Sequence, residues 1–242
     1  MYVLTLMGAL LAAYLVGSIS FAVLFSRALG LADPRSYGSK NPGATNVLRS
    51  GSRTAALLTL AFDALKGYAP VLLVLVFGPR FGLDETAAAF VGLAAFLGHL
   101  WPVFFRFQGG KGVATAAGVL MAVNPLLGLF TLLSFALVVA FSRYVSLGAI
   151  VAAAFAPFYQ ALIWGPEPLI VAIAVMSLLL VWRHEANIRK LLAGTESKLG
   201  QKAVALPPGP LQNVDKPHAL HHGQRHAQHP AKHHGKHKKG HS

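Results

Sequence analysis

The sequence contains no cysteine and few charged residues. Of its 242 residues 12% are charged, about half the usual share in soluble domains, while 55% are hydrophobic and the mean hydropathy is +0.55. The missing cysteine excludes disulfides, thiolate catalysis and cysteine-based metal sites. Residues 1–199 hold only seven acids, which leaves little for a carboxylate base or a metal cage. We therefore predict no metal and no cofactor, and the long apolar runs indicate an all-α, polytopic membrane protein.

The net charge of +13 has two sources. Residues 1–199 carry +7, and the short segment 200–242 carries +6 together with nine of the eleven histidines. This division argues against a nucleic-acid-binding domain. The segment 200–242 is low in complexity and predicted to be a disordered tail, which could touch anionic lipid or loosely bind Ni²⁺, Cu²⁺ or Zn²⁺. We predict a membrane domain over 1–199 followed by this tail.

Seven apolar runs are candidate membrane spans. They cover 2–26, 54–77, 86–105, 112–123, 125–141, 145–164 and 167–182. The run 112–123 is shorter than the roughly 20 residues of a straight crossing. Asn124-Pro125 is a turn signal, so we predict two helices there; one kinked helix over 112–141 would give six spans instead.

Basic residues indicate the orientation. Alternate connections carry Arg27, Arg35, Lys40, Arg49 and Arg53, then Arg106 and Lys111, then Arg143, then Arg183, Arg189, Lys190, Lys198 and Lys202. The other connections carry only Arg80. By the positive-inside rule, seven spans place the N-terminus outside and the C-terminus in the cytoplasm. We expect the first run to remain as a helix, because no basic segment or A-x-A site marks it as a signal peptide. Any active site would then lie at the cytoplasmic interface.

Three polar segments on that side have the residue types that bind anions. The first, 38–49, combines two glycines with Ser39, Asn41, Thr45, Asn46, Lys40 and Arg49. Arginine can hold a phosphate through two hydrogen bonds, and glycine lets backbone N–H groups turn toward an anion. A plain polar turn with positive-inside charge is the equally weighted alternative.

The second segment places glycines around a lysine ahead of a helix. It contains His99, then Gly109, Gly110, Lys111 and Gly112. It is not a Walker A loop, because Phe105 and Gly112 stand where that motif needs glycine and a hydroxyl residue. A helix N-terminus behind such a loop could still hold an anion. A flexible turn with a lysine that reaches the interface is the alternative.

The third segment follows the last span. His184 and Asn187 are spaced to share one helix face, whereas Arg189 and Lys190 are better explained as a membrane anchor. Within the second span, Asp63 and Lys66 form an i, i+3 pair, which favours a neutralised structural pair over direct substrate contact. No His-x₄-Asp, His-Glu-x-x-His or Gly-x-Ser-x-Gly motif is present.

Taken together, these segments resemble the bacterial PlsY family, the acyl-phosphate:glycerol-3-phosphate acyltransferases of the membrane. The matching segments are 17–21, 38–49, 63–67, 99–115, 143–147 and 187–196, in one order over about residues 5–199. Two departures are visible. Ser20 stands where members often have proline, and Gly148-Ala149 stands where many have two small hydroxyl residues.

The resemblance implies transfer of a fatty acyl group from acyl phosphate to the sn-1 hydroxyl of glycerol 3-phosphate, at the inner membrane. It implies His184, Lys111 and Asn187 as catalytic residues. It implies a substrate-binding set of Ser39, Asn41, Thr45, Asn46, Arg49, His99, Gly109, Gly110 and Gly112. Its partners would be the two substrates, membrane lipid and, by function, the enzyme that makes acyl phosphate. An acyltransferase that uses acyl-CoA or acyl carrier protein is the nearest alternative. A transporter of anions ranks behind, because the polar groups cluster at one interface and no internal repeat is visible.

Overall fold

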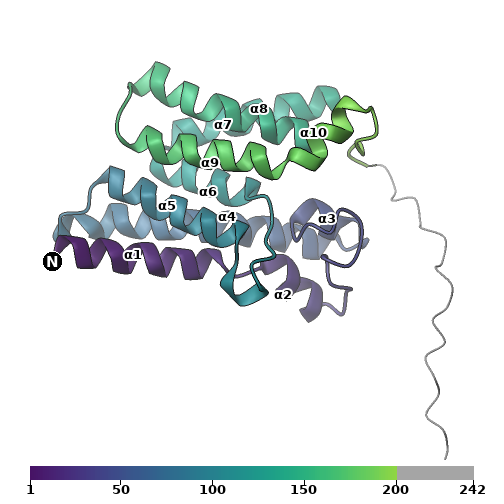
Figure 1. The fold of residues 1–242 in the computed structure, drawn as a ribbon, viewed down its shortest axis with the longest axis horizontal. Helices are drawn as coiled ribbons and strands as arrows, with labels where there is room; N and C mark the ends of the chain where they lie inside the picture. The colour runs from purple at the N-terminus through teal and green to yellow at the C-terminus, as the bar shows by residue number, and fades with distance from the viewer. Residues whose placement is uncertain (201–242) are drawn as a thin grey trace, which may run out of the picture. The chain divides into compact units, whose positions relative to one another are not determined.

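The structure, a computed structural model, describes residues 1–200, and all regular elements in that range are helices (Figure 1). The α-helices are α1 (Tyr2–Gly17), α2 (Phe21–Ala28), α3 (Ala44–Leu48), α4 (Arg53–Phe77), α5 (Glu85–Leu100), α6 (Val113–Val123), α7 (Pro125–Ser142), α8 (Val145–Tyr159), α9 (Leu169–Arg183) and α10 (Glu185–Leu192). Short 3₁₀ turns lie at η1 (Gly78–Phe81) and η2 (Val103–Phe105), and a π-helical turn, η3 (Gln160–Trp164), extends α8. The predicted all-α class is confirmed, whereas the predicted tail lies outside the described residues.

Several helices are long and apolar enough to cross a membrane. Within the described residues five segments pass this test: Tyr2–Ala28, Arg53–Phe81, Glu85–Phe105, Pro125–Ser142 and Val145–Trp164. The pair α9 and α10, bent by 56° at their junction, makes a sixth if it counts as one span. Helix α6 has 11 residues, which is short for a straight crossing. The protein is a multi-pass membrane protein, and the count of seven spans stays a prediction.

The predicted division of the run 112–141 is confirmed. Helix α6 ends at Val123 and α7 begins at Pro125, a residue that suits the first helical position because no N–H bond is needed there. The Asn124 Oδ1 accepts hydrogen bonds from the N–H groups of Leu126 (3.0 Å) and Leu127 (3.3 Å). This side-chain cap explains why the chain turns at that point.

The first apolar run, predicted as one span over 2–26, is still one candidate crossing, Tyr2–Ala28, but it is built from two helices. It breaks between Gly17 and Phe21, and the Ile19 carbonyl in the break accepts a hydrogen bond from the Lys66 Nζ of α4 at 2.7 Å. The Asp63 Oδ1 lies 2.8 Å from the same ammonium, and both charged side chains are buried. The pair therefore neutralises itself and holds the break against α4, in agreement with the predicted structural role.

Glycine sets the closest helix crossings. A Cβ on Gly17 of α1 would lie 2.0 Å from the Ala95 carbonyl oxygen of α5, and one on Gly118 of α6 would lie 2.0 Å from the Ala64 oxygen of α4. Membrane helices associate largely through such close packing. Helices α7, α8 and α9 pack as a second layer, and α6 contacts both layers (Figure 1).

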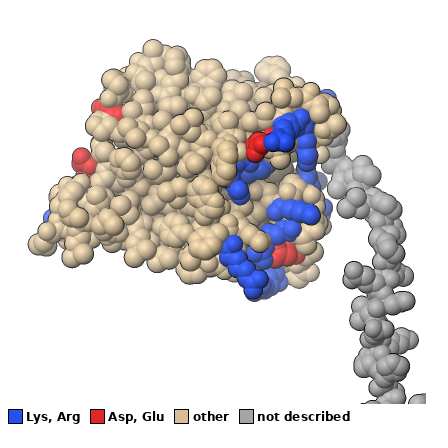
Figure 2. Space-filling model, viewed as in Figure 1, with Lys and Arg blue, Asp and Glu red and all other residues tan. Residues whose placement is uncertain are grey.

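Charge gathers at one end of the bundle. Lysine and arginine cluster over the end that holds α3 and α10, while the middle of the face shown in Figure 2 is uncharged and acidic groups lie toward the opposite end. Large apolar side chains are exposed along the helices, as expected for surfaces that face lipid, among them Leu57, Leu73, Leu137, Leu162 and Leu178. The three anion-binding segments predicted from the sequence all lie at the charged end.

Candidate active site

Asn46 organises the first polar loop. Its side chain is buried, and its Nδ2 donates to the carbonyls of Pro34 (2.7 Å) and Tyr37 (3.2 Å). Its Oδ1 accepts a hydrogen bond from the Ser39 N–H at 3.0 Å. Gly38 has a φ of +57°, and a Cβ there would lie 2.3 Å from that oxygen. Asn46 also lines the cavity described below, so its predicted contact with substrate stays a prediction, while its Nδ2 already bonds to the backbone and shapes the loop.

The short helix α3 and the turn before it provide the polar groups of this loop. Ser39, Asn41, Thr45 and Arg49 all line one cavity, which is described below. Arg49 follows the last residue of α3, and its side chain is exposed. The first loop therefore brings one cation and several neutral donors to a single surface.

The glycine-rich loop packs tightly on α5 at Gly109 and Gly110, while Lys111 and Gly112 face the cavity. The Gly110 N–H donates to the His99 carbonyl at 3.1 Å. A Cβ on Gly109 would lie 2.2 Å from that carbonyl oxygen, and one on Gly110 would lie 2.2 Å from the His99 Nε2. Neither glycine lines the cavity, whereas Gly112, the N-cap of α6, does. This differs from the expected cradle, because these two glycines permit close packing and the Gly110 N–H is already bonded.

His99 lies under this loop in a buried cluster. Its side chain is 7% exposed, and its Nδ1 lies 3.8 Å from the Asp63 Oδ1. Although His99 reaches the wall of the cavity, its ring is pressed between Gly110 and α4. His99 therefore supports the glycine-rich loop, and the substrate contact that the resemblance implies for it stays a prediction.

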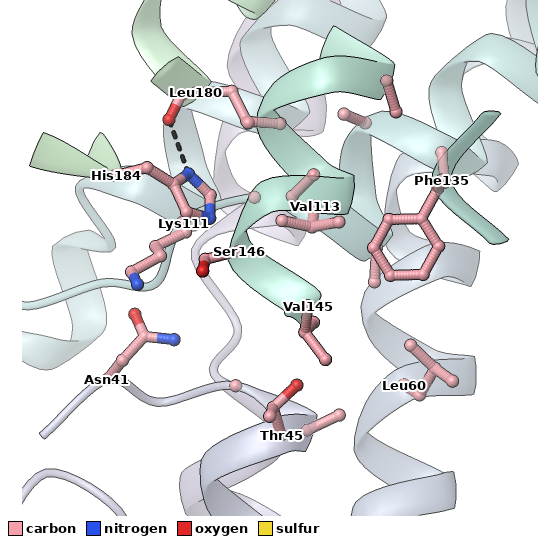
Figure 3. A pocket seen from close by; sticks show the side chains of 18 of the residues that line it. Asn41, Thr45, Leu60, Lys111, Val113, Phe135, Val145, Ser146, Leu180 and His184 are labelled. Atoms are coloured by element: carbon pink, nitrogen blue, oxygen red, sulfur yellow. Dashed lines mark hydrogen bonds between the residues drawn. The ribbon is translucent and has the colours of Figure 1, made fainter. Parts of the chain in front are cut away.

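His184 stands at the bend between α9 and α10, just after the last apolar helix ends at Arg183. Its side chain is buried, and its Nδ1 lies 2.8 Å from the Leu180 carbonyl oxygen (Figure 3). Because a carbonyl only accepts, Nδ1 carries the proton, and Nε2 is the acceptor of a neutral ring. His184 and Asn187 both line the cavity, as predicted for residues on one face.

A hydrogen-bond network joins three segments that are far apart in the chain. The Lys111 ammonium donates to the Asn187 Oδ1. The Asn187 Nδ2 and the Ser146 Oγ both donate to the Glu196 Oε1, at 2.6 and 2.7 Å. The Asn187 oxygen thus accepts from Lys111 while its nitrogen donates to Glu196, so the Lys111 ammonium is held against α10.

The Lys111 ammonium is easier to deprotonate than an ordinary lysine. Burial lowers the pKa of Lys111 from 10.5 to about 8, because a charged group is poorly solvated there. The Glu196 carboxylate acts in the opposite direction, and Lys190, Arg183 and Arg49 lower the pKa further. Lys111 remains mostly charged at neutral pH.

These groups form the polar end of a single cavity of about 870 Å³. In Figure 3, Asn41 and Thr45 lie across this space from Lys111, Ser146 and His184, and Phe135 and Leu60 mark its apolar side. Its apolar part is lined from α4 and from α6 to α9 by Leu60, Leu120, Phe135, Ala149, Ala152, Ala153, Ala156 and Ile173. Such a cavity suits a molecule with an anionic head and a long apolar chain.

The comparisons with known proteins agree with this geometry. A family model described as Glycerol-3-phosphate acyltransferase matches residues 7–194. The chain belongs to that family. It is 61% identical over 193 residues to the glycerol-3-phosphate acyltransferase of Paraburkholderia phytofirmans, covering 80% of this chain and 90% of the relative. It is also 61% identical over 191 residues to that of Ralstonia nicotianae, covering 79% and 92%.

A solved structure gives the same family. The crystal structure of PlsY, an integral membrane glycerol 3-phosphate acyltransferase, in its glycerol 3-phosphate form has a TM-score of 0.75 and 39% sequence identity to this chain. The match covers 81% of this chain and 96% of PlsY. The resemblance to the PlsY family drawn from the sequence motifs is thereby confirmed.

Several polar residues of this acyltransferase cavity were missing from the predicted site, among them Arg53, Thr131, Ser177 and Lys198. Ser146 and Glu196 were missing too, and these two meet in the network with Asn187. Both lie in segments that carry the resemblance, and Glu196 is one of only seven acids in residues 1–199, so motif membership was the available signal. Within the described residues no group of three or more histidine and acidic side chains could hold a metal ion.

Proposed function

We propose that the protein transfers a fatty acyl group from acyl phosphate to the sn-1 hydroxyl of glycerol 3-phosphate. The products are lysophosphatidic acid and inorganic phosphate. One observation carries the proposal: a single cavity joins a polar end rich in amides, hydroxyls and cations to an apolar passage between helices. This combination fits two phosphate-bearing substrates, one of which has a long acyl chain.

The polar end has donors enough for two phosphates. Arg49 with Ser39 offers one cationic group and one hydroxyl at the first loop, and Lys111 with Asn187 offers a second cation and an amide at the other side. We assign glycerol 3-phosphate to Arg49, because a bidentate arginine suits a ground-state phosphate. Lys111 is assigned to the phosphate that leaves, where negative charge develops during the reaction.

The apolar part fits one acyl chain. Along α8 the cavity lining runs from Ser146 to Ala156, which is about 15 Å at 1.5 Å per residue. One leaflet of a bilayer has a hydrocarbon depth of about 15 Å. The small side chains of Ala149, Ala152 and Ala153 leave room for the chain beside α8. We propose that the acyl chain enters from the bilayer and lies along this wall.

The reaction needs no covalent acyl-enzyme, because phosphate is already a good leaving group. The sn-1 oxygen attacks the acyl carbonyl carbon, a new C–O bond forms, and the bond from that carbon to the phosphate oxygen breaks. The hydroxyl proton passes to an oxygen of a substrate phosphate, which leaves with it. Binding both substrates in one cavity supplies orientation, and Lys111 stabilises the departing charge.

A direct assay tests the activity and the donor together. The full chain in lipid is given glycerol 3-phosphate with palmitoyl phosphate, and phosphate release and lysophosphatidic acid are measured. Palmitoyl-CoA and palmitoyl-acyl carrier protein serve as parallel donors. We expect product from palmitoyl phosphate alone. Product from a thioester but not from acyl phosphate would overturn the donor assignment and leave the acceptor assignment standing.

We further propose seven membrane crossings, with the N-terminus outside and the cavity's polar end in the cytoplasm. The cluster of lysine and arginine at that end supports this orientation (Figure 2). In a bacterium this places the enzyme in the inner membrane, in functional sequence with the enzyme that makes acyl phosphate. A reporter fused after Gly200 should be active in the cytoplasm, and one inserted near Pro79 should report outside. Opposite signals would reverse the orientation.

A further inference from the structure

Arg183, the last residue of α9, bonds to the glycine-rich loop. Its Nε donates to the Gly110 carbonyl oxygen at 3.2 Å, and one terminal nitrogen donates to the oxygens of Gly110 (3.1 Å) and Gly109 (3.0 Å). Arg183 does not line the cavity. Its guanidinium therefore faces two backbone carbonyls and is not part of the surface that would hold substrate.

These bonds fix the peptide groups that lead to Lys111. In a planar trans peptide the C=O and the following N–H point in opposite directions. The Gly109 carbonyl accepts from Arg183 on one side, and the Gly110 N–H donates to the His99 carbonyl on the other. The next peptide is held through the Gly110 carbonyl, so the backbone from which the Lys111 side chain leaves has one direction.

The same arginine also ties this loop to the other catalytic segment. Arg183 directly precedes His184, while Lys111 reaches across to Asn187 on α10. We propose that Arg183 is a positioning residue, which holds Lys111 in register with His184 and Asn187 without contacting substrate. This inference rests on the proposed function, because it concerns the reaction in the same cavity.

A lysine in place of Arg183 could position the glycine-rich loop only in part. The guanidinium is a planar fork that reaches both carbonyls at once, whereas an ammonium is a single point of donation on a flexible stem. A role as one more cation of the positive-inside pattern needs only charge. Lysine would then replace arginine without loss, so the lysine variant separates the two roles.

The test compares three variants of the full chain in detergent: Arg183→Gln, Arg183→Lys and, as a matched charge control, Arg189→Gln. Arg189 is exposed on α10 and pairs with Glu185, away from the loop. For each variant, calorimetry gives the binding stoichiometry and Kd for glycerol 3-phosphate, and initial rates give kcat. The stoichiometry gives the fraction of protein that is folded and able to bind. Dividing the rate by this fraction keeps unfolded protein from being counted as a lower kcat.

We expect Arg183→Gln to lower kcat about 30-fold at full stoichiometry, the loss typical of a charge-assisted contact, with Kd within about threefold. Arg183→Lys should lower kcat about fivefold, and Arg189→Gln less than about twofold. If Arg183→Gln does not fold, the lysine variant decides alone. Unchanged kcat in Arg183→Lys would overturn the proposal, and so would a loss confined to Kd or stoichiometry.

The wild-type chain separates this test from that of the proposed function. If it transfers acyl groups only from a thioester, the donor assignment fails, and the same three variants are compared with the thioester. If it transfers none to glycerol 3-phosphate, the proposed function fails and the positioning role falls with it. A wild type active with acyl phosphate and an Arg183→Lys variant of equal kcat would refute only the positioning role.

Discussion

This enzyme should lose activity at a lower pH than an enzyme that depends on a lysine of ordinary pKa, 10.5. Burial lowers the pKa of Lys111 to about 8, and we expect the reaction to need the charged ammonium on the departing phosphate. The charged form prevails below that pKa and is lost above it. At pH 7 about nine-tenths of Lys111 is charged, and at pH 9 about one-tenth, so kcat/KM should fall roughly tenfold between them.

The profile of kcat should differ from that of kcat/KM. The first reports the complex with substrate and the second the free enzyme. A bound phosphate dianion favours the ammonium form, so the alkaline limb of kcat should lie at higher pH than that of kcat/KM. Phosphate release from acyl phosphate, measured from pH 6 to pH 10 at limiting and saturating glycerol 3-phosphate, gives both limbs.

Glu196 provides a directed test of the cause. Its carboxylate raises the pKa of Lys111 against the effect of burial. The Glu196→Gln variant removes that charge but keeps an oxygen that can accept from Ser146 and Asn187. Its kcat/KM limb should therefore move to lower pH. The exposed Glu185 supplies the control, since Glu185→Gln should leave the limb in place. The reasoning would be refuted if the alkaline limb of kcat/KM in the wild type lay near pH 10.5. It would also be refuted if Glu196→Gln left that limb at the same pH.

Four substitutions test other parts of the site and the fold. Arg49→Ala should mainly raise KM for glycerol 3-phosphate and lower kcat/KM about 30- to 1000-fold, corresponding to about 2–4 kcal/mol; a change in kcat alone would contradict the assignment. His184→Ala should slow turnover but leave it above that of empty membranes, and complete loss with both substrates still bound would make His184 the general base. Ala152→Leu should shift activity from long toward short acyl phosphates, measured as relative kcat/KM, because the side chain fills the cavity beside α8. Asp63→Asn leaves the Lys66 charge unpaired and should cost about 3–5 kcal/mol of stability, seen as lower yield and Tm with KM unchanged in the folded fraction.

The sequence alone was sufficient for the class of the protein and for several residues that line its cavity. Apolar runs of this length predict membrane-spanning helices, because every backbone N–H and C=O in lipid must be hydrogen-bonded within the protein. The turn at Asn124 was readable because its cap is local in sequence. Among the predicted site residues, Arg49, Lys111, His184 and Asn187 do line one cavity. Their roles in catalysis and binding stay predictions until the variants are measured.

What the tertiary structure decided is which polar groups remain for a ligand. From sequence, Asn46 and Gly110 look like anion donors, but Asn46 bonds to the backbone of its own loop and Gly110 to the His99 carbonyl. From sequence, Arg183 is one more cation of the positive-inside pattern, yet its donors face the glycine-rich loop. Glu196 enters the cavity only because the chain folds back after α10. Residue types and spacing therefore determine which chemistry is possible near the interface, whereas long-range packing decides which hydrogen bonds are already made within the protein.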